Sequence, residues 1–236
     1  MIDINCDLGE GLNNEAEIMP LIDSCNIACG GHAGDRVSIA ECLRLSELYS
    51  VKPGAHPSYP DKLNFGRMSM ELPEEELIHQ LEYQMDLMLE VVVESGIDLH
   101  HIKAHGALYN DIARNHKLAS VYLRAMEPYK DRLFLYVPWN SAVAEVALEN
   151  GYKVRYEAFG DRNYNDDLSL VSRHSDQAVL TSKDQVLTHI KEMFENQRVK
   201  TVNGLYKTLK ADTFCIHSDT ENAVDILKYL RESLNT

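Results

Sequence analysis

The chain has 236 residues, of which 44% are hydrophobic and 25% charged, and its formal net charge is −14 at pH 7. This length and composition suit one globular domain with a full core, and the acidic balance argues against nucleic acid and anionic membrane as partners. No apolar run approaches the roughly 18–20 residues of a membrane-spanning helix, so we expect no membrane span.

Short apolar runs alternate with longer helical patterns along the chain, which is typical of β/α units around a parallel sheet. In chain order, the predicted strands are Ile2–Cys6, Cys25–Ala28, Val51–Ala55, Leu99–Lys103, Leu133–Val137, Lys153–Ala158 and Thr213–Ile216. The predicted helices are Val37–Ser50, Pro73–Ser95, Lys117–Met126, Ser141–Asn150, Asp184–Gln197 and Glu221–Leu234. Seven strands with helices between most of them predict an α/β fold, a single-domain, distorted TIM-like β/α barrel over residues 1–236. An open doubly wound sheet is the alternative, although no G-x-G-x-x-G motif follows the first strand.

The cysteines are odd in number in a chain that is not small, so we expect free thiols rather than a disulfide framework; they are Cys6, Cys25, Cys29, Cys42 and Cys215. The N-terminal residues lack the basic and apolar regions of a signal peptide. Both features predict a cytoplasmic protein.

Polar loops punctuated by Gly or Pro follow six of the seven predicted strands. Their chemically able side chains are Asp7 and Glu10, His32 and Asp35, His56 and Arg67, His105 and Asn110, Asp161 and Arg162, and His217 and Asp219. In parallel α/β folds, ligands bind outside the carboxyl ends of the strands. We therefore predict that these loops converge in one active site.

Several of these residues have plain structural alternatives. Asp7 could cap a turn, Glu10 could be a solvated loop carboxylate, and Asp35 could be the N-cap of the following helix. A functional role is favoured for His32, which lies among glycines, and for His56, which the following proline forces into an extended conformation.

A second set of histidines lies near the predicted fourth strand and in the helices. His101, Lys103 and His105 share one face of the strand, so we expect one of them to face the barrel interior, and His100 to point outward. Surface positions are expected for the remaining four, which are His79, His116, His174 and His189.

Two kinds of chemistry remain open. Asp7 with His32, His56 and His105 could hold a divalent metal ion and acidify a bound water, although no H-E-x-x-H pair is present. A metal-free acid–base site on the same residues is the alternative. The sequence also lacks the G-x-S-x-G elbow of serine hydrolases and the G-x-x-x-x-G-K-[ST] loop of P-loop ATPases.

The loop sequences resemble the LamB/YcsF family over nearly the whole chain. The motifs that carry the resemblance are Asn5-Cys6-Asp7-Leu8-Gly9-Glu10, the run from Asn26 to Asp35, the run from Gly54 to Asp61, His105-Gly106-Ala107-Leu108-Tyr109-Asn110, Phe65-Gly66-Arg67, Asp161-Arg162-Asn163-Tyr164 and Ser218-Asp219-Thr220. The chain departs from the usual pattern at Ala104, Gly160 and Ser218, where the family usually has Pro, Ala and Gly. None of these departures removes a candidate catalytic side chain.

The resemblance implies a barrel related to glycoside hydrolases and carbohydrate deacetylases, and ATP-dependent opening of 5-oxo-L-proline to L-glutamate. It also implies two partner subunits, B and C, which would share the handling of ATP and Mg²⁺. We expect Asp7, assisted by His32, His56 or His105, to act as the general base. The expected substrate-binding residues are Glu10, Asp35, Arg67, Lys103, Asn110, Asp161, Arg162 and His217. Two other hypotheses are a stand-alone metal-dependent hydrolase or deacetylase, and a non-catalytic binding subunit.

Overall fold

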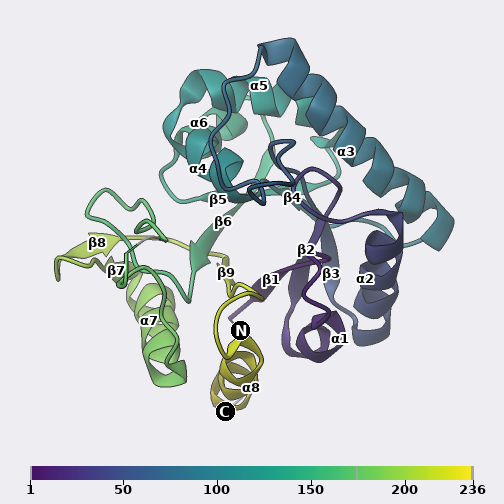
Figure 1. Ribbon diagram of the computed structural model, residues 1–236. Coiled ribbons are helices and arrows are strands. Elements are labelled where there is room, and N and C mark those ends of the chain that lie inside the picture. The colour runs from purple at the N-terminus through teal and green to yellow at the C-terminus, as the bar shows by residue number, and fades with distance from the viewer. Residues whose placement is uncertain (1, 174, 235–236) are drawn as a thin grey trace.

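A closed barrel of seven parallel strands forms the centre of the computed structural model, which describes residues 2–173 and 175–234 (Figure 1). The order around the barrel is β1-β2-β3-β4-β5-β6-β9. These strands are Ile4–Leu8 (β1), Ser24–Ala28 (β2), Lys52–His56 (β3), His101–Lys103 (β4), Phe134–Pro138 (β5), Lys153–Phe159 (β6) and Thr213–Cys215 (β9). All seven predicted strands are present within a few residues, and the closed barrel excludes the open-sheet alternative.

Helices surround the barrel, and the long helix α3 runs along its outside (Figure 1). The predicted helices correspond to Arg36–Tyr49 (α2), Glu74–Ser95 (α3), His116–Met126 (α5), Ala142–Glu149 (α6), Lys183–Asn196 (α7) and Ala223–Leu234 (α8). Four further segments were not predicted, namely Glu15–Ile18 (α1), Gly106–Arg114 (α4) and the short 3-10 turns Met19–Leu21 and Glu127–Tyr129. These segments are too short to carry a long periodic apolar stripe.

An antiparallel hairpin was not predicted either. Its strands are Arg198–Lys200 (β7) and Tyr206–Thr208 (β8), and it lies beside α7, away from the barrel strands (Figure 1). The Asp166 carboxylate accepts hydrogen bonds from the side chains of Thr201, at 2.6 Å, and Asn203, at 2.9 Å. The hairpin tip is therefore tied to the loop that follows β6.

The barrel interior is unusually polar. Buried Asn5, Ser24, Asn26, His101 and Thr213 lie on its strands, where branched apolar residues are usual. A Cβ on Gly54 of β3 would lie 2.3 Å from the His101 ring, so a residue without a side chain is needed beside this imidazole.

The cysteine and histidine predictions can be compared with this fold. All five cysteines are free thiols, as expected, and all five are buried. His79 and His116 are exposed as predicted, but His189 is half-buried, with its Nε2 3.1 Å from the Arg162 carbonyl oxygen, so the surface prediction is wrong for it. His174 lies outside the described residues. Within the described ranges, no helix is long and apolar enough to cross a membrane.

Candidate active site

Asp7, near the end of β1, lies at the centre of the loops that were predicted to converge. Its Oδ1 accepts hydrogen bonds from Lys103 Nζ at 2.9 Å and from Asn26 Nδ2 at 2.7 Å, and its Oδ2 lies 3.4 Å from His56 Nε2. Burial alone would raise the pKa of Asp7, but His56 and Lys103 together hold it well below its usual range. The carboxylate is therefore ionised at neutral pH.

His56 and His105 point unprotonated nitrogens at one another. Each ring has its other nitrogen against a backbone carbonyl oxygen, His56 Nδ1 at 2.8 Å from Lys103 O and His105 Nε2 at 3.0 Å from Phe65 O. A carbonyl only accepts, so each of these nitrogens donates a proton. His56 Nε2 and His105 Nδ1 then face each other at 3.0 Å with lone pairs. Such a pair calls for a cation between the rings, either a proton or a metal ion.

Four donor atoms surround this point. Ligand atoms of Asp7, Glu10, His56 and His105 all lie within 4.8 Å of one another. Carboxylate oxygens and imidazole nitrogens are suitable ligands for a divalent transition metal such as Zn²⁺, so these side chains fit a metal ion. His32 had been predicted among the candidate ligands; in the described part of the chain, Glu10 completes this group instead.

His32 lies against the group rather than in it. Its ring stacks on that of His105 with centroids 3.6 Å apart, and its Nε2 lies 3.0 Å from Glu10 Oε1. Burial lowers the pKa of both imidazoles and, with the charge of Asp7, raises the pKa of Glu10 to about 7. Burial therefore disfavours the charged forms of all three side chains.

Lys103, on β4, links Asp7 on β1 to Glu157 on β6. Its ammonium group is buried and lies 2.9 Å from both Asp7 Oδ1 and Glu157 Oε1, and 3.2 Å from Cys215 Sγ. Burial opposes the charge, but Asp7, Cys215 and Glu157 together raise the pKa of Lys103 well above its usual value. Only one of the three residues His101, Lys103 and His105 was expected to face inward, whereas all three are buried.

Asp161 and His217 form a second pair at the same end of the barrel. The Asp161 carboxylate accepts hydrogen bonds from His217 Nδ1, at 3.0 Å, from the His217 backbone N–H and from the Thr220 hydroxyl. The His217 ring also stacks on Phe159, and its ligand atom lies within 4.8 Å of those of Asp7 and Cys215. Asp161, which was predicted to bind substrate, therefore fixes the orientation of the His217 ring.

Three predicted substrate-binding residues have other partners. Asp35 is exposed and caps α2, accepting hydrogen bonds from the backbone N–H groups of residues 37 and 38. Arg162 is buried and donates to the carbonyl oxygens of residues 171 and 178, which organises the loop after β6. Arg67 is exposed and pairs with Asp219 at 2.5 Å. Asn110, a fourth predicted substrate-binding residue, lies in α4, where its side-chain amide donates to the Gly106 carbonyl oxygen at 3.0 Å.

Two residues of the site were not predicted from the sequence. Asn26 donates to Asp7, and Glu157 pairs with Lys103. Both are polar residues within predicted strands, which is the signal that could have drawn attention to them, because a buried polar side chain needs a partner.

Comparison with known proteins identifies the family of this chain. The sequence model of the LamB/YcsF family matches residues 2–236. The chain is 39% identical to the A subunit of 5-oxoprolinase from Thermococcus sibiricus and 38% identical to that from Pyrococcus horikoshii, in each case over 99% of this chain and 93% of the relative. The crystal structure of the lactam utilization protein from Thermus thermophilus superposes with a TM-score of 0.91 at 33% identity, covering 99% of this chain and 96% of that one. The chain belongs to the LamB/YcsF family.

Proposed function

We propose that this chain is the A subunit of a 5-oxoprolinase, which hydrolyses 5-oxo-L-proline to L-glutamate at the expense of ATP together with partner subunits B and C. The observation that carries the proposal is the buried cluster of Asp7, His56 and His105, found in a chain that matches 5-oxoprolinase A subunits over nearly its full length. Because these relatives are named as one subunit of an enzyme, they also support a complex of several chains.

The reaction requires an activated carbonyl and an activated water. Transfer of the terminal phosphoryl group of ATP to the lactam oxygen would make the ring carbon electrophilic. Water then adds to this carbon and a base takes its proton. The ring nitrogen takes up a proton as the C–N bond breaks, and hydrolysis of the resulting acyl phosphate releases L-glutamate and inorganic phosphate. Because the sequence has no P-loop, we assign the handling of ATP and Mg²⁺ to a site shared with the partner subunits.

We propose that Asp7, His56 and His105 act as one acid–base unit. The ring nitrogens that face each other are the basic atoms, and Asp7 lies 3.4 Å from His56 Nε2, where it stabilises the imidazolium that forms when the ring takes a proton from water. Lys103 and Asn26 fix the Asp7 carboxylate. A divalent metal ion held by Asp7, Glu10, His56 and His105 would acidify its bound water.

Replacement of Asp7 by Asn tests this role in the reconstituted three-subunit complex. Asn keeps the size but removes the charge, so we expect glutamate formation to fall at least about 100-fold, within the range that general acid–base groups contribute. A matched control is His116→Asn at an exposed residue of α5, which should leave the rate unchanged. Full activity of Asp7→Asn would exclude Asp7 from the chemistry and favour a non-catalytic role for this chain.

A stand-alone metal-dependent hydrolase is the second candidate, favoured by the four ligand atoms within 4.8 Å of one another. It predicts hydrolysis of an amide or acetyl group by the isolated chain, without ATP or partners, and loss of this activity in a chelator. We place either reaction in the cytoplasm, where the five free, buried thiols would stay reduced.

A further inference from the structure

Three loops at the end of the barrel that holds the active site meet at a single carboxylate, that of Asp219. Asp219 lies in the loop after β9, and its Oδ2 is 2.5 Å from Nη2 of Arg67 and 3.2 Å from Nη1 of Arg173. Arg67 belongs to the loop after β3 and Arg173 to the loop after β6. Within the described residues, no other carboxylate pairs with either guanidinium. Two positive charges therefore share one negative charge.

Arg67 lies close to the imidazoles of the active site. Its Cζ is 5.0 Å from the centroid of the Phe65 ring, and that ring lies 5.2 Å from the His32 ring and 5.5 Å from the His105 ring. The neighbouring Gly66 is so near that a Cβ on it would lie 2.9 Å from the His32 Cβ. One aromatic ring thus separates the guanidinium from the imidazoles.

Backbone hydrogen bonds fix the turn that carries Arg67. The Gly66 N–H donates to the Asp61 carbonyl oxygen at 2.8 Å, and the Gly66 carbonyl oxygen accepts from the Ala107 N–H of α4 at 2.9 Å. Both arginines are also in contact with solvent, since the side chains of Arg67 and Arg173 are 40% and 30% exposed. A ligand from solution can therefore reach the two guanidiniums.

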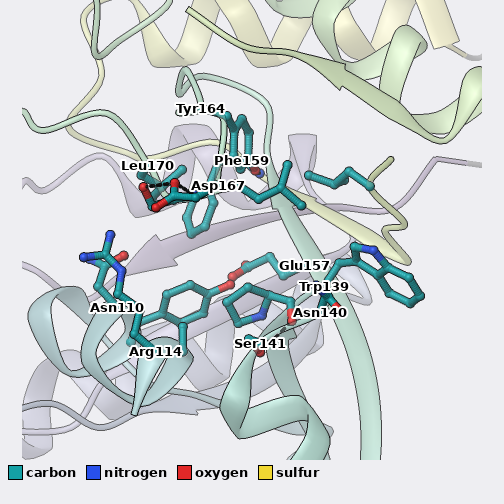
Figure 2. A pocket seen from close by; sticks show the side chains of 16 residues that line it. Asn110, Arg114, Trp139, Asn140, Ser141, Glu157, Phe159, Tyr164, Asp167 and Leu170 are labelled. Carbon is teal, nitrogen blue, oxygen red and sulfur yellow. Dashed lines mark hydrogen bonds between the residues drawn. The ribbon is translucent and has the colours of Figure 1, made fainter. Parts of the chain in front are cut away.

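Three other cations lie near this end of the barrel, and they have other surroundings. Lys103 is buried in its ion pairs with Asp7 and Glu157, and Arg162 donates to two backbone carbonyl oxygens. Figure 2 shows Arg114 at a separate cavity, at the carboxyl ends of β5 and β6. None of the four clustered donor residues of the active site is among the described residues that line this cavity. The cations that can receive an anion beside the imidazoles are therefore the two that share Asp219.

We infer that Arg67 and Arg173 form a binding site for a dianionic phosphoryl group, and that Asp219 occupies this site until the ligand displaces it. A phosphoryl dianion balances both guanidinium charges, whereas a carboxylate ligand would only replace the single charge that Asp219 already supplies. Guanidinium groups also match the geometry of phosphate oxygens, with two parallel N–H donors each.

This inference rests on the proposed function, in which the phosphoryl group is carried by the lactam oxygen and then by the acyl phosphate. The group must be held while water attacks the adjacent carbon and the ring opens. A site one aromatic ring away from the His32 and His105 imidazoles keeps the phosphoryl group near the acid–base unit during these steps. This chain would then take part in handling the phosphoryl group, together with the partner subunits.

Asp219 acts as a competitor of the ligand in this arrangement. Its side chain is 24% exposed, so it can turn toward solvent when the phosphoryl group binds. Removal of its charge should therefore strengthen phosphate binding, whereas removal of either guanidinium should weaken it. A purely structural ion pair between loops would not give effects of opposite sign.

Calorimetric titration of the isolated full-length chain with methyl phosphate at pH 7 tests the site directly. Methyl phosphate carries the phosphoryl group on one small oxygen substituent and is mostly dianionic at this pH. Arg67→Gln and Arg173→Gln should each weaken binding about 10-fold or more, and Asp219→Asn should strengthen it by about 2- to 5-fold. Acetate should bind more weakly than methyl phosphate to the wild type. Arg44→Gln, at an exposed arginine of α2, is the matched control and should leave both affinities unchanged.

Kinetics of the reconstituted complex distinguish the phosphoryl group from the carboxylate of the substrate. Arg173→Gln should lower kcat for ATP-dependent glutamate formation about 10-fold or more and leave KM for 5-oxo-L-proline unchanged, because the phosphoryl group is absent from the substrate as it first binds. A raised KM with an unchanged kcat would mean that the arginine binds the substrate carboxylate, and it would overturn the inference.

Two outcomes of the titration would also overturn the inference. One is the absence of methyl phosphate binding by Asp219→Asn, in which no charged carboxylate competes. The other is weaker binding by all three variants, which would mean that the ion pairs only hold the loops together. If the wild-type complex forms no glutamate from 5-oxo-L-proline and ATP, the proposed function fails instead, and the titration alone then decides whether the phosphate site exists.

Discussion

Lys103 should be the most costly single cation to remove from the core of this protein. Its ammonium group is 2% exposed and lies 2.9 Å from a carboxylate oxygen of Asp7 and of Glu157. Lys103→Met keeps the length of the side chain but leaves two buried carboxylates without their cation. Breaking a buried ion pair from one side costs about 3–5 kcal/mol.

The corresponding change in thermal stability is large enough to measure directly. A chain of this size loses about 2–4 °C in Tm for each kcal/mol, so Lys103→Met should melt roughly 6–20 °C below the wild type. Thermal and urea unfolding at pH 7, followed by circular dichroism, give the two values. Lys117→Met is the control, because that ammonium is 81% exposed in its pair with Glu74, and we expect no measurable shift.

A double variant separates charge from packing. Lys103→Met with Glu157→Gln leaves one buried charge instead of two, so it should be more stable than Lys103→Met alone. Two results would contradict this reasoning: an unchanged Tm for Lys103→Met, or a further loss of stability on adding Glu157→Gln. Either would mean that the Lys103 ammonium does not compensate the charges of Asp7 and Glu157.

Three other features give testable expectations. Burial lowers the pKa of His189 to about 4, so the unfolded chain binds the extra proton first; stability should fall as the pH drops from about 6.5 to about 4, and the urea midpoint of His189→Asn should fall less over that window. Gly54→Ala places a Cβ 2.3 Å from the His101 ring and should cost about 1–3 kcal/mol in urea unfolding; a wild-type midpoint would show that the ring can move aside. Asp166→Ala removes the bonds to Thr201 and Asn203 at the hairpin tip, so amide hydrogen exchange should accelerate at residues 201–204 and stay unchanged in α3; equal exchange in both proteins would mean that the hairpin is held by other contacts.

The barrel and the convergence of the loop side chains at one of its ends could be predicted because both depend on local patterns. Apolar runs mark strands, and parallel strands bring the loops that follow them to one end of a barrel. Asp7, His56 and His105 are far apart in the chain, the two histidines being 49 positions apart, and they meet for this reason alone. The alternation of strands and helices thus brings together side chains that are not neighbours in sequence.

The partners of each side chain could not be predicted in the same way. Whether Arg162 would bind substrate or backbone depends on where the carbonyl oxygens of residues 171 and 178 lie, and a loop without periodicity gives no indication of this. An aspartate just before a helix, such as Asp35, can be either a helix cap or a catalytic acid. In the structure Asp35 is exposed and caps α2. Glu157 lies within a predicted strand, and its partner Lys103 lies on a different strand. The sequence around Glu157 therefore gives no indication of this ion pair.

The polar interior of the barrel sets the charge state of Asp7 that its proposed role requires. His101 Nε2 lies 2.7 Å from Asn26 Oδ1, so the amide oxygen of Asn26 faces the imidazole and its nitrogen must face the other way. That nitrogen donates one proton to Asn5 Oδ1 at 2.8 Å and the other to Asp7 Oδ1 at 2.7 Å. Every hydrogen-bonding group of the Asn26 amide is thus assigned, and the group presented to Asp7 is a donor. A donor favours the ionised carboxylate over the neutral acid, so these buried polar groups stabilise the ionised form of Asp7, in which it would stabilise an imidazolium as proposed.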